Sequence, residues 1–187
     1  MDFIKKYVDD LKKTISLVNE NDIKSVINVL EKARETGKTI FTMGNGGSAS
    51  TASHFVNGLS QGATVEGRSR FKAVGLTDNI PNMLAYANDL GYENIFVEQL
   101  KNLMKEGDIV IGISGSGNSP NVLKGIEYAN THNAVSIGFT GYDGGKLKKM
   151  VKYSIHVPCN FMEMVEDIHL ATTHLIASYF RFTYQKK

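Results

Sequence analysis

Apolar residues recur every three or four positions in two stretches at the start of the chain. The stripe of the first stretch consists of Phe3, Tyr7, Leu11, Ile15 and Val18. The second stretch begins at Asn21-Asp22 and ends at Gly37, which suits a helix C-terminus. Both patterns predict amphipathic helices. Such stripes must be covered, so we expect the two helices to pack on the flank of the domain or on another subunit.

From residue 38 onwards, short apolar runs alternate with helical patterns. Runs at 38–43, 71–76, 108–113, 134–139 and 153–157 predict five strands. A long helix is expected from about Glu163 to Tyr184. This alternation predicts an α/β fold with a single doubly wound, five-stranded parallel sheet flanked by helices. We expect one domain over 1–187, divided into N-terminal helices (1–36), an α/β core (37–160) and a C-terminal helix (161–187).

Two of these strands run into turns rich in glycine and serine. Residues 44–49 read GNGGSA and residues 114–119 read SGSGNS. Ser48 and Ser119 suit helix N-caps, and Pro120 suits the first helical position. Free N–H groups and the helix dipole favour an anion there, although an ordinary strand-to-helix turn is the alternative. No Lys follows in the Walker position, so we expect a sugar phosphate and no nucleotide cofactor.

Composition and charge limit the partners and the cellular compartment to be expected. The 187 residues are 42% hydrophobic, enough for one domain with a full core, and the formal net charge is +2. That charge does not indicate nucleic acid or a membrane as a partner. Cys159 is the single cysteine, and the N-terminus lacks the apolar region of a signal peptide. We therefore expect a cytoplasmic protein.

Five motifs, in order, resemble the SIS (sugar isomerase) domain. They are GNGGSASTASHF (44–55), YANDLGYENIF (86–96), GISGSGNSPNV (112–122), TGYDGGKL (140–147) and VEDIHLATTHLI (165–176). Within that superfamily they are most similar to the phosphoheptose isomerases, which convert sedoheptulose 7-phosphate to a heptose 7-phosphate. The resemblance covers nearly the whole chain. It implies an isomerase of heptose biosynthesis that works as a homotetramer.

The resemblance also assigns substrate contacts. They fall on Asn45, Gly46, Gly47, Ser48, Asn88, Asp89, Ser114, Gly115, Ser116, Ser119 and Glu166. The physical interpretation agrees for the serines, since hydroxyls at helix N-termini suit a phosphate. For Asn88-Asp89, a turn after a helix is the alternative.

Members of this family often bind zinc through a His, a Glu four residues on, and a Gln and a His on the last helix. Here these positions hold His54, Gly58, Glu166 and His174. The resemblance therefore implies zinc ligands at His54, Glu166 and His174, whereas His54 taken alone suits a structural role. His169 is expected to be a packing residue or to support the site.

Isomerisation through an enediol needs a base, and Gly58 cannot replace the family's Glu. Our hypothesis makes Glu166 the base and His174 its acid partner. A Glu that binds metal is a poorer base, so Asp167 or Asp89 are alternatives, and Glu166 could simply complement a helix dipole. The alternative function is a non-catalytic SIS protein that binds phosphosugars or another protein.

Overall fold

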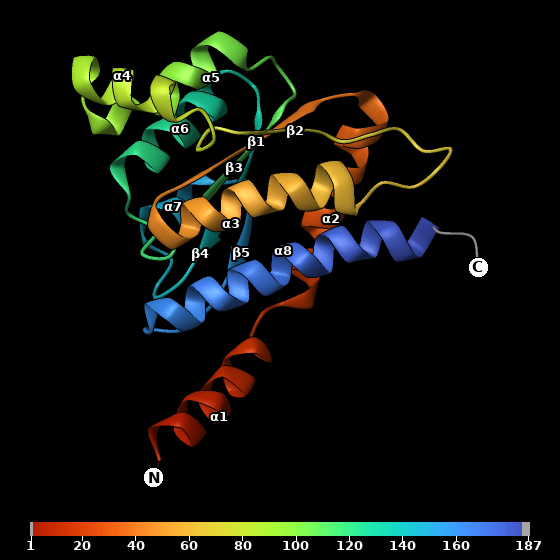
Figure 1. Cartoon of the computed structure of the whole chain (residues 1–187), viewed down its shortest axis with the longest axis vertical. Helices are drawn as coiled ribbons and strands as arrows, with labels where there is room; N and C mark the ends of the chain where they lie inside the picture. The colour runs from red at the N-terminus through yellow and green to blue at the C-terminus, as the bar shows by residue number, and fades with distance from the viewer. Residues whose placement is uncertain (1, 185–187) are drawn as a thin grey trace.

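The computed structural model describes residues 2–184, and their elements follow the predicted alternation (Figure 1). The helices are α1 (Phe3–Ile15), α2 (Glu20–Thr36), α3 (Gly46–Asn57), α4 (Ile80–Leu90), α5 (Val97–Leu103), α6 (Pro120–Thr131), α7 (Gly145–Met150) and α8 (Met162–Tyr184). The strands are β1 (Thr39–Gly44), β2 (Lys72–Gly75), β3 (Ile109–Ser114), β4 (Val135–Thr140) and β5 (Tyr153–His156). A π-helix, η1 (Gly58–Gly62), continues α3, and a 3₁₀ turn, η2 (Tyr92–Asn94), precedes α5.

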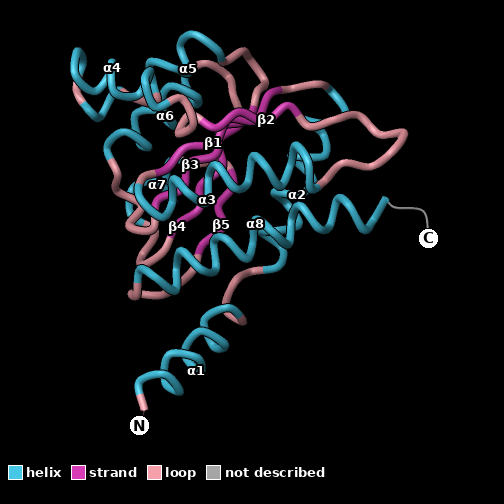
Figure 2. The backbone as a smooth tube through the Cα atoms, in the orientation of Figure 1, coloured by secondary structure: helices cyan, strands magenta, loops and turns pink. Residues whose placement is uncertain are grey.

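The five strands form one parallel sheet in the order β2-β1-β3-β4-β5. Helices cover both of its faces, so the strands lie in the centre of the molecule (Figure 2). This confirms the predicted five-stranded α/β fold with N- and C-terminal helices. The strand order reverses between β1 and β3, which places the ligand-binding switch point of such sheets at their carboxyl ends.

Two apolar cores lie on opposite faces of the sheet. One is formed with α2, α3 and α8, and its largest side chains include Phe55, Phe139 and Phe180. The other lies under α5, α6 and α7 and includes Phe41 and Phe96. Each fully buried Phe contributes roughly 1.5–3 kcal/mol of transfer free energy. Within residues 2–184, no helix has the length and apolarity to cross a membrane.

Two local expectations differ from the structure. A turn after a helix was the alternative interpretation of Asn88-Asp89, but α4 continues to Leu90 and ends before Gly91, whose φ is +92°. Both polar residues are exposed, so the last helical turn accommodates them without burying a polar group. Ser48 was expected to cap α3, but the helix already begins at Gly46 and its N-cap is Asn45.

Helix α1 extends away from the sheet domain (Figure 1). The Tyr7 ring meets Phe161 edge-on with centroids 5.8 Å apart, and the Tyr7 hydroxyl donates to Asp167 at 2.9 Å. Phe3 and Ile4 remain about 70% exposed. Part of the predicted stripe is therefore left uncovered by the chain itself.

Candidate functional site

Both glycine-rich turns leave the sheet at its switch point. β1 and β3 are neighbours, and Gly44 pairs in register with Ile113. The turn after β1 opens α3, and the turn after β3 opens α6. Ligands of open parallel sheets bind beyond these carboxyl ends, so the two predicted loops lie together where a phosphosugar is expected.

A reciprocal amide pair joins the two turns. Asn45 Nδ2 donates to Asn121 Oδ1, and Asn121 Nδ2 donates to Asn45 Oδ1, both at 2.9 Å. Tyr92 donates its hydroxyl to Asn45 Oδ1 at 2.9 Å. Asn121 is only 1% exposed, so its amide is committed to this link. The sequence analysis missed Asn121 and Tyr92, although both fall within quoted motifs.

The serines of the second turn interact with each other. Ser114 Oγ and Ser119 Oγ lie 3.0 Å apart. Ser119 occupies the N-cap position of α6, but its side chain makes no capping hydrogen bond. The predicted N-cap position of Ser119 is therefore confirmed, but its hydroxyl lies against Ser114 and does not cap the helix. Both hydroxyls lie next to the helix N-terminus, where an anion is favoured.

The turn after β4 supports this serine loop from outside. Leu147 N–H donates to Gly117 O at 2.9 Å, and Lys146 N–H donates to Asn118 Oδ1 at 3.2 Å. Gly117 has a φ of +66°, and a Cβ there would collide with Gly144 O. Close backbone packing thus fixes the conformation of the loop. This packing explains why the motifs at 112–122 and 140–147 contain glycines where they meet.

A pocket of about 290 Å³ lies between α3 and the first turns of α8. Its lining residues are Gly47, Ser50, Thr51, His54, Glu166, Asp167 and Leu170. The pocket brings Glu166 and His54 together, two of the residues proposed for catalysis or metal binding. The start of α8 also packs on the serine loop, because a Cβ on Gly115 would lie 3.6 Å from Val165 Cγ1.

Glu166 points at the first turn of α3. A Cβ on Gly47 would collide with the Glu166 carboxylate, so glycine permits this approach. Burial raises the pKa of Glu166, and the negative charges of Glu163 and Asp167 raise it further, while the Ser48 backbone N–H opposes the shift. A carboxylate with a raised pKa is a stronger proton acceptor.

The two predicted histidines meet across α3 and α8. His54 Nε2 and His174 Nε2 lie 2.6 Å apart, with the rings at 76°. In a neutral pair, one nitrogen must donate and the other accept. His174 is eight residues from Glu166 on the same helix, about 12 Å along its axis. Within one chain, His174 therefore does not line the pocket itself and is connected to it by its hydrogen bond with His54.

Of the three predicted zinc ligands, the structure brings two histidine nitrogens into direct contact. Catalytic zinc takes three protein ligands, and the His54–His174 pair offers two nitrogens. Among residues 2–184, no group of three His, Cys, Asp or Glu side chains is placed to hold a metal ion. The donor set of a single chain therefore does not complete a zinc site.

The remaining assigned residues lie outside this pocket. Asn88 and Asp89 are exposed on α4, where Asn88 Nδ2 donates to Asp89 Oδ1 at 2.8 Å. His169 is fully buried, and its Nε2 lies 3.2 Å from Thr140 O. Burial lowers the pKa of His169 to about 4. The structure therefore agrees with the expected packing role of His169.

Comparisons with known proteins agree with this geometry. Residues 3–141 match the family described as SIS domain. The phosphoheptose isomerase of Geotalea daltonii is 35% identical over 176 residues, covering 92% of this chain and 91% of that protein. The probable phosphoheptose isomerase of Thermoplasma acidophilum is 34% identical over 174 residues, with coverage of 93% and 95%.

A solved structure extends the likeness to three dimensions. The phosphoheptose isomerase of Neisseria gonorrhoeae superposes with a TM-score of 0.87 at 25% identity, covering 95% of this chain and 96% of that one. The fold and the matched motifs define a SIS domain protein, and the chain belongs to its phosphoheptose isomerase family.

Proposed function

We propose that this protein is an aldose–ketose isomerase that converts sedoheptulose 7-phosphate to a heptose 7-phosphate in the cytoplasm. The relatives named phosphoheptose isomerase support this reaction. The setting is supported by the single cysteine, which is typical of a reducing compartment.

One observation carries the proposal. The carboxylate of Glu166 lies against Gly47 in the first turn, and its neighbour Val165 packs beside Gly115 in the second. This position between the two turns supports Glu166 as the base. A phosphate held by Ser114, Ser116 and Ser119 would direct the sugar towards this carboxylate, with Ser48 and the Asn45 turn on the other side.

The proposed chemistry moves one proton between adjacent carbons. Glu166 removes the C1 proton of the ketose, which gives an enediol, and returns a proton to C2, which gives the aldose. A second proton must pass between the oxygens on C1 and C2. The predicted acid partner His174 would move it through His54, which lines the same pocket and shares a hydrogen bond with His174. General acid–base groups of this kind typically contribute 10²–10⁴-fold.

Incubation of the protein with sedoheptulose 7-phosphate, followed by ¹H NMR, tests the proposal. An aldose anomeric signal should grow with time and stop at an equilibrium ratio. In D₂O, deuterium should enter at C2, as an enediol requires. An unchanged ketose spectrum over a day at micromolar enzyme would contradict the proposal.

Zinc binding is a separate prediction, because the proton transfers proposed for Glu166 and the histidines do not require a metal ion. Elemental analysis of protein purified without chelator should find zinc if His54, Glu166 and His174 act together as ligands. Loss of the zinc in His54→Ala and Glu166→Ala, with zinc retained in His156→Ala, would support that ligand set. Equal zinc content in all variants would argue against it.

A second function is favoured by one observation. The residue four positions after His54 is Gly58, so the carboxylate expected from the family is missing. A protein that binds phosphosugars without turnover fits this loss. For such a protein, adding sedoheptulose 7-phosphate would protect the amides of the serine loop from hydrogen exchange. The NMR spectrum of the sugar would stay unchanged.

A further inference from the structure

A second pocket, of about 390 Å³, lies farther along the same two helical segments. It is lined by Gln61, Gly62, Thr64, Arg70 and Arg181. Gln61 and Gly62 belong to η1, which continues from α3, and Arg181 is on α8. Arg181 is seven residues beyond His174, about 10 Å along the helix. In this chain the pocket is therefore separate from the histidine pair and from the serine loop.

Among the described residues, the two arginines have no carboxylate partner. Within residues 2–184, neither Arg70 nor Arg181 has an acidic oxygen within 4 Å, whereas Arg34 and Arg68 share Glu31. Arg70 Nη1 donates to Thr64 Oγ1 at 2.7 Å. Arg181 Nε is buried and has no hydrogen-bond partner in the part of the chain described. An anion in the pocket would be contacted by the accessible part of the Arg181 side chain and by Arg70, which both line it.

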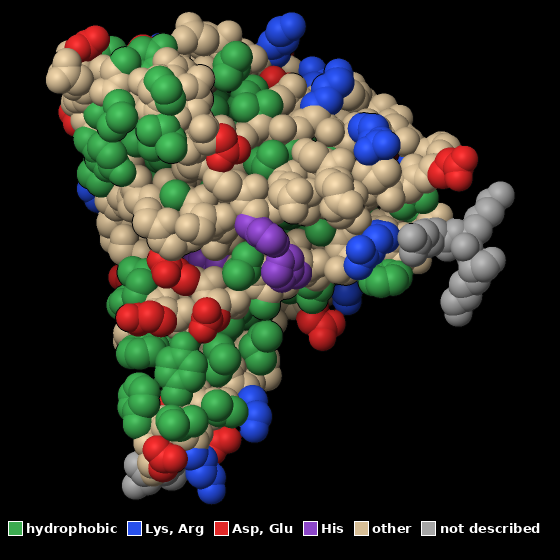
Figure 3. All heavy atoms as spheres, in the orientation of Figure 1, with side chains coloured by type: hydrophobic (Ala, Val, Ile, Leu, Met, Phe, Trp, Pro, Cys, Tyr) green, Lys and Arg blue, Asp and Glu red, His purple; other side chains and the backbone are tan. Residues whose placement is uncertain are grey.

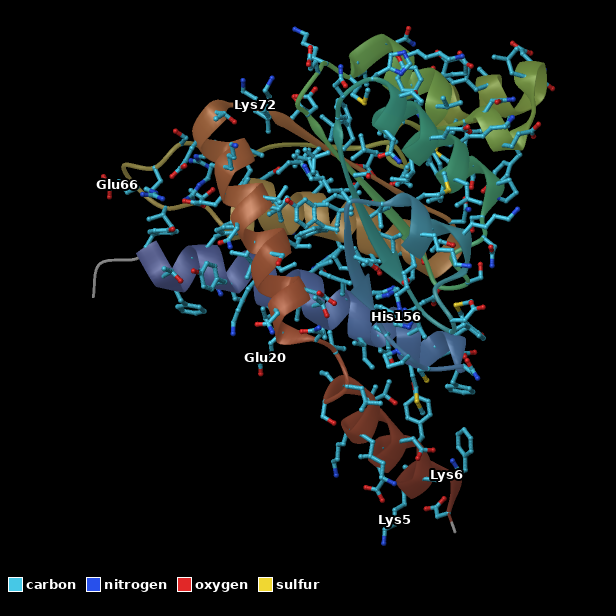
Figure 4. The ribbon with its side chains drawn as sticks, turned by 180° about the vertical axis from the view of Figure 1, so that it is seen from behind. Lys5, Lys6, Glu20, Glu66, Lys72 and His156 are labelled. Carbon is cyan, nitrogen blue, oxygen red and sulfur yellow. The ribbon has the colours of Figure 1, made fainter. Side chains whose placement is uncertain are left out.

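Nearby acidic residues do not neutralise the pocket. Glu66 is the one acidic residue of the loop 63–71, and it lies at the outer tip of that loop (Figure 4). The guanidinium of Arg181 also stacks on the exposed Phe182 ring, 4.7 Å from its centroid. This stacking holds the cation without removing its charge.

The backbone leaves room for a ligand. η1 is a π-helix, a form that is often found at functional sites. A Cβ at Gly62 would meet nothing within 4 Å. The pocket therefore has open space beside an amide, a hydroxyl and two arginines that form no ion pair within residues 2–184.

We propose that this pocket is a second anion site, which binds a phosphate dianion or the phosphate group of a sugar phosphate. Two positive charges match a dianion, and the guanidinium fork pairs with phosphate oxygens through two parallel hydrogen bonds. The Thr64 hydroxyl and the Gln61 amide supply further donors. The site does not depend on the isomerase reaction.

Calorimetric titration of inorganic phosphate separates the two anion sites. The probe is added to the full-length Ser114→Ala/Ser116→Ala/Ser119→Ala variant, which lacks the hydroxyls of the loop. One phosphate per chain should still bind. Adding Arg70→Gln and Arg181→Gln should weaken that binding at least tenfold. Gly62→Glu, which places a carboxylate in open space, should do the same without removing any arginine contact.

Lys32→Gln in the same background is the control for losing a surface positive charge, because Lys32 is exposed on α2 and forms no ion pair within 4 Å among the described residues. It should leave the affinity within twofold. A second titration with sedoheptulose 7-phosphate distinguishes a sugar phosphate from free phosphate. Absence of residual binding, or binding that survives both the arginine and the Gly62 substitutions, would overturn the proposal. Equal weakening by Lys32→Gln would overturn it as well.

Discussion

At the residue scale, the proposed reaction depends on the carboxylate of Glu166. Glu166→Gln keeps the size and one oxygen but removes the base, so turnover should fall about 10²-fold or more. Sugar-phosphate affinity should change little. Glu127→Gln, at an exposed position of α6 outside the pocket lining, is the matched control and should retain activity. NMR initial rates measure both variants.

Gly47→Ala tests the same assignment without changing a titratable group. Its Cβ would collide with the Glu166 carboxylate, which must then move. We expect a loss of turnover that approaches that of Glu166→Gln. Gly62→Ala, where a Cβ meets open space, should behave as wild type. Full activity in both Gly47→Ala and Glu166→Gln would show that another group is the base.

His169 gives a prediction for stability against pH. Burial lowers its pKa from 6.5 to about 4, so between these values the unfolded chain binds the proton and the folded chain does not. Stability should therefore be fully present above pH 6.5 and fall as the pH drops towards 4, by on the order of 3 kcal/mol. His169→Gln should flatten this part of a urea-unfolding series measured from pH 7 to 4.5.

Single residues were predictable where their chemistry shows in the sequence. The serines, His54, Glu166 and His174 were identified by type and motif. The sequence could not show that Ser119 turns towards Ser114 instead of capping α6, because both options need the same hydroxyl. Nor could it reveal that Gly47 makes room for Glu166, a contact between residues 119 positions apart in the chain.

At the element scale, the Asn45–Asn121 pair holds the starts of α3 and α6 together. Asn121→Ala should leave Asn45 without this partner and loosen both turns, so KM for the sugar phosphate should rise about tenfold, corresponding to about 1.4 kcal/mol. Tyr92→Phe removes one hydrogen bond to Asn45 and keeps the pair, so its effect should be smaller. Steady-state kinetics separates KM from kcat, and equal KM values for Asn121→Ala and wild type would contradict the link.

The junction between α3 and η1 gives a gain-of-function prediction. Gly58→Glu restores the carboxylate expected from the family, but its Cβ would lie 3.3 Å from Ala177 Cβ, so the helices must separate slightly. Ala177→Gly removes that contact. If the two carboxylates serve one site, the Glu166→Gln/Gly58→Glu/Ala177→Gly variant should recover at least tenfold activity over Glu166→Gln. Ala177→Gly with Glu166→Gln alone is the control and should stay inactive.

Elements were more predictable than their ends. The buried strands appeared as continuous apolar runs, and the structure places each within two residues of its expected limits. The end of α4 was missed because Asn88-Asp89 suits a turn in isolation, while the helix stops at Gly91. The π-helix η1 was not predicted, since GLSQG has no distinctive pattern and the sequence does not show that this segment packs against α8.

At the scale of the whole molecule, the predicted tetramer concerns the uncovered face of α1. Figure 3 shows hydrophobic side chains along this extension and the histidines on the same side of the molecule. Phe3 is 71% exposed, Ile4 70% and Ile15 49%. Exposing an apolar stripe to water is unfavourable. We therefore predict that a second copy of the chain covers this face of α1.

Light scattering at micromolar concentration should give four chain masses for the wild type. Replacing Phe3, Ile4 and Ile15 with Ser removes apolar area that makes few contacts within the chain, so the fold should survive while the assembly dissociates. Leu84→Ser, at a side chain 64% exposed on α4, is the matched control and should leave the mass unchanged. Far-UV circular dichroism checks that the α1 variant keeps its helices. A wild-type monomer, or a tetramer unaffected by the three α1 substitutions, would show that this stripe is not the contact between subunits.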